Sequence, residues 1–210
     1  MMRVVKSRRL VAYVVDFFVV FLLISLVGQI KFLNPNYEKY NNTYEKLYEF
    51  QESVDEEELK DPVVAQKTLD TYSKFIYKLD KYSISQMTIV IIVIVLYYTL
   101  FPLANNNQTI GKRLMKLEIV SLKENKKIKW HNLFIRSFVY PYYIYGSALS
   151  YLIKLISVVS LTDKSYIYVS AVITVVNLMY CYISFMMMVI NKEGISLHDR
   201  LSGTKVVEKL

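Results

Sequence analysis

Apolar residues along this chain gather in runs of about 20 positions that alternate with polar segments. A helix of about 20 residues is the length needed to cross the roughly 30 Å hydrocarbon layer of a bilayer. The pattern therefore predicts membrane-spanning helices rather than the short amphipathic stripes of a soluble domain. Four spans are expected, at about residues 10–32, 84–103, 133–161 and 166–190.

The first run, residues 10–32, follows a basic stretch at residues 6–9 and contains one acid, Asp16. A signal peptide is the alternative interpretation of such a segment. The apolar run exceeds the usual 7 to 15 residues by about half, includes an acid, and lacks a clean cleavage site between small residues. We therefore expect an uncleaved anchor.

Residues 33–83 differ sharply in composition, because Tyr, Asn, Glu and Lys dominate and four acids follow one another at 55–58. This insert is expected outside the bilayer. Its apolar residues recur at helical spacing, which predicts two helices divided near Asp61 and Pro62. A disordered loop is the alternative.

Irregular structure is expected at two further places. In the basic loop 104–131, the segment 117–130 (LEIVSLKENKKIKW) predicts two short strands around a polar turn, a β-hairpin. In the third span, a kink is expected near Pro141 and Gly146.

The distribution of charge sets the expected orientation. The formal net charge of +8 could suggest nucleic-acid binding, but the Lys and Arg residues cluster at the ends of the apolar runs. The positive-inside rule then places both termini and the basic loop in the cytoplasm and the acidic insert 33–83 outside. We predict an all-α transmembrane protein, a single four-helix membrane domain over residues 1–210, and no nucleic-acid partner.

Asp16 and Arg136 are the charged residues expected inside the membrane. Both lie on the cytoplasmic half of their spans, at similar depth, so an Asp16–Arg136 ion pair is expected. In one interpretation the pair only fixes helix packing. In the other, Asp16 takes up protons or a small cation during alternating access. Both remain open at this point.

Other polar motifs favour structural or surface roles. Ile110, Leu114 and Leu117 predict the lipid-facing side of a basic interfacial helix. Its other side, with Lys112, Arg113 and Lys116, is expected to meet anionic headgroups. His198 and Asp199 are neighbours after the fourth span, where such a pair caps or tethers a helix more often than it catalyses a reaction. One cysteine, Cys181, excludes an intrachain disulfide. We expect no metal, no cofactor and no enzymatic activity.

Three separated segments resemble the signatures of the RDD family of bacterial membrane proteins, which is named for one arginine and two aspartates. The first is RRLVAYVVD, residues 8–16, the second NNQTIGKRLMKLEIV, residues 106–120, and the third HDRLSGTKVV, residues 198–207. The resemblance makes Arg9 the arginine, Asp16 the first aspartate and Asp199 the second, and many members carry an arginine where this chain has Arg136. Supporting motif residues are Thr109, Gly111, Lys112, Arg113, His198, Gly203 and Thr204.

The resemblance implies a transport role in the plasma membrane of a bacterium, because some members are described as sodium/proton antiporters. We therefore expect a component of ion or small-solute transport, working as a homo-oligomer in the bilayer. The charged centre would be Arg9, Asp16, Arg136 and Asp199. The alternative is a non-transporting accessory or immunity-type protein that binds a protein partner through the insert 33–83, which is longer and more acidic than in the simplest members.

Overall fold

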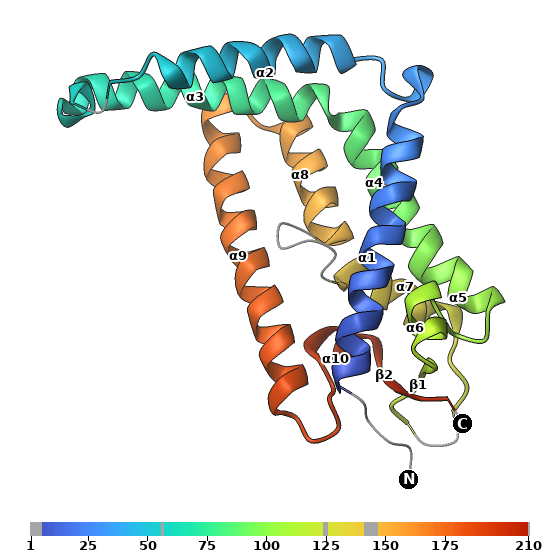
Figure 1. The fold of residues 1–210 in the computed structure, drawn as a ribbon. Coiled ribbons are helices and arrows are strands. Elements are labelled where there is room, and N and C mark those ends of the chain that lie inside the picture. The colour runs from blue at the N-terminus through green and yellow to red at the C-terminus, as the bar shows by residue number, and fades with distance from the viewer. Residues whose placement is uncertain (1–5, 56, 124–125, 141–146, 210) are drawn as a thin grey trace.

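The computed structural model describes residues 6–55, 57–123, 126–140 and 147–209. Within these ranges, three helices are long and apolar enough to cross a membrane by length and composition (Figure 1). They are α1 (Lys6–Gly28), the continuous stretch Ile84–Ala104, and α9 (Asp163–Ile190). All three were expected from the sequence.

Helix α1 has one face that packs against the rest of the protein and other faces that are exposed. Its buried residues are Arg9, Ala12, Asp16, Val20 and Ile24, spaced three or four apart. This spacing forms one stripe along the helix. The other faces present large apolar side chains such as Phe18 and Leu22, each 58% exposed. Such a surface suits hydrocarbon, and the two buried charged residues, Arg9 and Asp16, lie on the protein-facing side.

The second span is continuous but not regular. It consists of α4 (Ile84–Val95), a π-helical segment (Leu96–Leu100) and α5 (Phe101–Ala104). Phe101 donates its backbone N–H to the carbonyl of Leu96, five residues back. Pro102 follows and has no N–H to offer the preceding turn. The wider turn buries the side chains of Tyr97, Tyr98 and Thr99.

The stretch 133–161 is not the single helix that the sequence predicts. It holds α7 (Trp130–Val139) and α8 (Ala148–Ser160). Tyr140, which ends α7, has φ −69° and ψ 127°, an extended conformation. A residue before proline is pushed out of the helical region in this way. The kink expected near Pro141 and Gly146 lies outside the described residues.

The insert forms two helices, as predicted. They are α2 (Tyr37–Glu52) and α3 (Pro62–Tyr82), with short 3₁₀ turns at Lys31–Leu33 and Glu58–Lys60. Asp61 caps α3 by accepting the N–H of Val63 at 2.8 Å. In Figure 1 this pair runs across the ends of α8 and α9 and continues beyond them. The Tyr166 hydroxyl donates to Asp80 at 2.5 Å, which joins α9 to α3.

The opposite end of the molecule, called the terminal end here, carries a two-stranded antiparallel sheet. Strand β1 (Leu117–Ser121) pairs with β2 (Thr204–Glu208), not with a neighbouring strand in the loop. The predicted hairpin is therefore wrong. The described residues 126–129 form no strand, whereas Ile119 and its partner Val206 are both buried in the sheet. Two short helices flank the sheet, α6 (Ile110–Leu114) and α10 (Leu197–Ser202).

Two apolar cores support these elements. One includes Val20 of α1, Ile94 of α4 and Ala148 of α8. The other joins Ala12 to Leu133 of α7 and to the sheet residue Val206 at the terminal end. The buried charged residues lie between these cores, because Ala12 and Val20 flank Asp16 on the same stripe of α1.

Candidate functional site

Asp16 is completely buried and is surrounded by hydrogen-bond donors. Its Oδ1 accepts the Tyr97 hydroxyl at 2.7 Å and the Gly111 backbone N–H at 2.8 Å. Its Oδ2 accepts the Thr109 hydroxyl at 2.6 Å and lies 3.4 Å from the ammonium nitrogen of Lys112. Four donors thus occupy the roughly four lone-pair positions of a carboxylate.

The segment around Gly111 brings three of these donors to α1. Thr109 stands before α6 in an extended conformation, so its side chain also accepts the N–H of Lys112 at 3.4 Å. Gly111 lies directly against the backbone of α1: a Cβ at this position would clash with the carbonyl oxygen of Ala12 and lie 2.8 Å from Oδ1 of Asp16. Only glycine permits this close approach.

Asp199 forms a second buried centre with two arginines. Its Oδ2 lies 2.6 Å from Nη2 of Arg9, and its Oδ1 accepts Nη1 of Arg136. Arg9 also donates through Nη1 to the carbonyl of Gly194. Ser196 is the residue that precedes α10, and its N–H and hydroxyl donate to Oδ2 of Asp199 at 2.9 and 2.6 Å. All five residues come together at the terminal end.

Electrostatics fixes the charges of this second centre. Burial alone would raise the pKa of Asp199, but the guanidinium groups of Arg136 and Arg9 hold it well below its usual range. Burial lowers the pKa of His198 well below its usual value, against the opposing effect of Asp199. At neutral pH Asp199 is therefore ionised and His198 is neutral.

Tyr140 joins the two centres. Its ring lies 5.8 Å from Nζ of Lys112 and 5.8 Å from Cζ of Arg136, which is cation–π distance for both. The ring also meets the His198 ring edge to face, with 4.7 Å between centroids. The two ion pairs therefore form one continuous polar cluster.

The expected Asp16–Arg136 pair is wrong. Asp16 pairs with Lys112, and Arg136 pairs with Asp199 and donates to the Thr204 hydroxyl at 2.7 Å. The prediction rested on equal depth in the membrane, which does not determine lateral neighbours. The interfacial helix is wrong as well, because Lys112 is 4% exposed and Leu117 is buried in β1.

The motif residues divide into those inside the cluster and those outside it. Arg113 is exposed and takes no part. Gly203 acts through its backbone: it ends α10 with φ +64°, a left-handed conformation that favours glycine. Sequence reasoning missed Tyr97, Tyr140 and Ser196. Ser196 was detectable, because Ser-x-x-Asp at residues 196–199 has the spacing of a capping box.

A cavity of about 270 Å³ opens beside the cluster. Its polar lining includes Arg9, Lys112, Ser184 and His198, and Leu10 and Phe185 belong to its apolar lining. Because these residues come largely from α1 and α9, it is called the α1–α9 cavity below.

Comparison with known proteins gives one result. The model of the RDD family matches residues 5–203, nearly the whole chain, so this protein belongs to the RDD family. No curated protein matches the chain. No solved structure matches it either.

Proposed function

We propose that this membrane protein of the RDD family is a component of ion transport that exchanges a small cation for a proton. The observation that carries the proposal is the Lys112–Asp16 ion pair. Its two side chains are 5% and 0% exposed. Burial lowers the pKa of the amine, and a carboxylate lies beside it, so a proton on the amine and a cation on the carboxylate can replace each other.

The exchange is balanced in charge. Burial lowers the pKa of Lys112, while Asp16 opposes the shift and Arg136 adds to it. When a small cation binds Asp16, it takes the place of the Lys112 ammonium as counter-charge. Lys112 then releases one proton and remains as a neutral amine. The pair is neutral before the step, and the pair together with its bound cation is neutral after it.

The surroundings of Asp16 favour such an exchange. The hydroxyl oxygens of Tyr97 and Thr109 lie 2.7 and 2.6 Å from the carboxylate, so both can turn to become oxygen ligands of a hard cation. Tyr97 belongs to the π-helical segment, and Tyr140 stands at the end of α7. Interrupted helices beside buried charges are the usual construction of ion sites in transporters.

Sodium-dependent proton flux in inverted vesicles from an antiporter-deficient host tests the proposal. Lys112→Arg keeps the positive charge but cannot release the proton near neutral pH, so flux should vanish. Asp16→Asn should abolish flux as well. Lys116→Arg, at an exposed position, is the matched control and should keep wild-type flux. Wild-type flux equal to that of empty vesicles, or full flux with Lys112→Arg, would refute the exchange.

We further infer that both termini face the cytoplasm and that the working unit is a homo-oligomer. The acidic insert and the basic terminal end lie at opposite ends of the spans (Figure 1), which supports the orientation. In the 18-residue apolar stretch of α9, only 11% is buried inside the protein. That surface is available to a second copy as well as to lipid.

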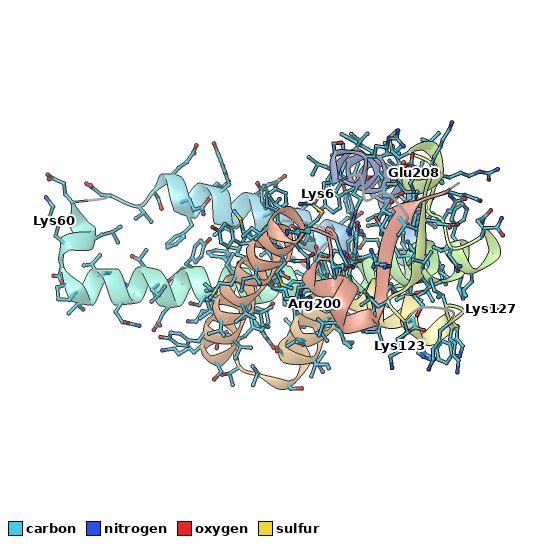
Figure 2. All side chains as sticks on the ribbon, turned by 90° about the horizontal axis from the view of Figure 1, so that it is seen from below. Lys6, Lys60, Lys123, Lys127, Arg200 and Glu208 are labelled. Carbon is cyan, nitrogen blue, oxygen red and sulfur yellow. The ribbon has the colours of Figure 1, made fainter. Side chains whose placement is uncertain are left out.

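A second function, that of an accessory or immunity-type protein, is favoured by the insert. Viewed from the terminal end, Lys60 at the tip of the α2–α3 pair lies far from Lys6 and Glu208 (Figure 2). The pair thus presents a long platform to a protein partner. Deleting residues 37–80 should leave ion exchange intact in monodisperse protein, whereas an accessory role would be lost. Neither function requires enzymatic activity.

A further inference from the structure

The α1–α9 cavity lies near one end of two membrane-crossing helices. Arg9 is three residues from the start of α1, and Met188 is two residues from the end of α9. At 1.5 Å per residue, each is within about 5 Å of its helix end. Tyr13 and Cys181, which also line the cavity, are about 10 to 14 Å from those ends. The cavity therefore reaches from headgroup depth into the first part of the hydrocarbon.

The charged cluster beside this cavity, which reaches the lining through Arg9 and Lys112, carries one uncompensated positive charge. Arg9 and Arg136 share the single carboxylate of Asp199, and His198 beside them is neutral. The Lys112–Asp16 pair is neutral wherever its proton resides. One positive charge is left over in a group of side chains that are each at most 8% exposed. An anion in the cavity would offset it.

The mouth of the cavity is apolar. Leu10 of α1 and Phe185 of α9 belong to the lining and are 48% and 47% exposed. Both sit on spanning helices, so their exposed faces meet hydrocarbon rather than water. A ligand that fits this mouth has an apolar part that extends from the cavity into the bilayer.

We propose that the α1–α9 cavity binds the anionic headgroup of a phospholipid beside Arg9, with its acyl chains leaving between Leu10 and Phe185. The cavity of about 270 Å³ is slightly smaller than typical ligand pockets, so it accommodates a headgroup and not the whole lipid. The lipid is a bound partner of the charged cluster and is separate from the cation that is exchanged at Asp16.

Thermal unfolding of the full-length protein in maltoside detergent provides the first test. Dioctanoyl phosphatidylglycerol should raise Tm by about 5 °C near saturation, as expected for a ligand that binds only the folded state. Dioctanoyl phosphatidylcholine and inorganic phosphate should not. Met188→Trp fills the cavity and should abolish the shift, whereas Met179→Trp, at an exposed position of the same helix, should keep it.

Each other outcome overturns the proposal. Equal shifts with the two lipids would mean that headgroup charge is not recognised. A full shift with phosphate alone would assign the site to a soluble anion. A shift that survives Met188→Trp would place the lipid elsewhere. None of these results bears on the proton flux of the Lys112 variants, so the two proposals fail separately.

A second measurement uses the unaltered protein. Cys181, the chain's single cysteine, lines the cavity, so its rate of modification by a maleimide reports on occupancy. Phosphatidylglycerol should slow labelling several-fold, and phosphatidylcholine at the same concentration should not. Equal rates with both lipids would overturn the proposal even if Met188→Trp failed to fold.

Discussion

Gly111→Ala should destabilise the protein far more than the same change at Gly28. At Gly111, the new methyl group would clash with the Ala12 carbonyl oxygen and lie 2.8 Å from Asp16 Oδ1. Both neighbours are fixed, one as backbone and one by four donors. At Gly28, a methyl group would meet only the end of the Gln86 side chain, at 3.0 and 3.1 Å, and that side chain can move.

The size of the effect follows from these contacts. Inserting a methyl group into a packed site costs about 1 to 3 kcal/mol. Moving α6 away also lengthens the 2.8 Å hydrogen bond from Gly111 to the carboxylate, a kind of bond that contributes about 1.5 to 3 kcal/mol. These costs overlap, so we expect about 2 to 4 kcal/mol in total. The helix-propensity gain of alanine, at most about 1 kcal/mol, applies to both positions and cancels in the comparison.

Thermal unfolding of the purified protein in detergent measures the difference, with the fluorescence of the single tryptophan, Trp130, as the signal. For a chain of this size, Gly111→Ala should lower Tm by about 4 to 16 °C. Gly28→Ala should stay within about 2 to 4 °C of wild type. Equal Tm values for the two variants would refute the close approach of α6 to α1.

Three further predictions concern the charged cluster. Asp16→Asn leaves the Lys112 ammonium without its counter-charge and should lower the free energy of unfolding by about 3 to 5 kcal/mol. In a double-mutant cycle, the variant that combines Asp16→Asn with Lys112→Met should recover part of this loss. Arg9→Lys should lower the free energy of unfolding by about 1 to 3 kcal/mol, because a single ammonium nitrogen replaces the two guanidinium nitrogens that now contact Gly194 and Asp199 from separate positions. An unchanged Tm would contradict this. In the unfolded chain the His198 imidazole has its ordinary pKa of about 6.5, and in the folded protein that pKa is well below this value. As pH falls, the imidazole is therefore protonated first in the unfolded state. Stability present above about pH 6.5 should therefore be lost toward pH 5, by up to about 1.4 kcal/mol per pH unit, and His198→Gln should flatten this dependence of Tm on pH.

The sequence predicted what depends on local pattern. Apolar runs long enough to cross a bilayer identified α1, the stretch Ile84–Ala104 and α9, because length and composition alone define such helices. Pro62 after a capping aspartate marked the start of α3 for an equally local reason. The motif segments also identified the family, since their residues and order are properties of the sequence itself.

What the sequence could not predict is which side chains meet across the molecule. Arg136 and Asp16 have similar depth, yet the packing of α10 against α7 and of α6 against α1 gives each a different partner. The same limit explains the wrong hairpin, because β1 pairs with a strand more than 80 residues later. The sequence predicted Lys112 at the membrane surface, because nothing in the local pattern indicates that the carboxylate of Asp16 lies beside it.

The salt bridge between Arg9 and Asp199 joins residues 190 positions apart, which sets the timing of assembly during synthesis. At about 5 to 20 residues per second, the ribosome delivers the aspartate roughly 10 to 40 s after the arginine. During that interval α1 enters the membrane while the Arg9 guanidinium lacks its final partner. Helix α10 therefore completes the buried cluster only after α1 and α7 have been made, and a chain that stops short of Asp199 leaves Arg9 and Arg136 without their carboxylate.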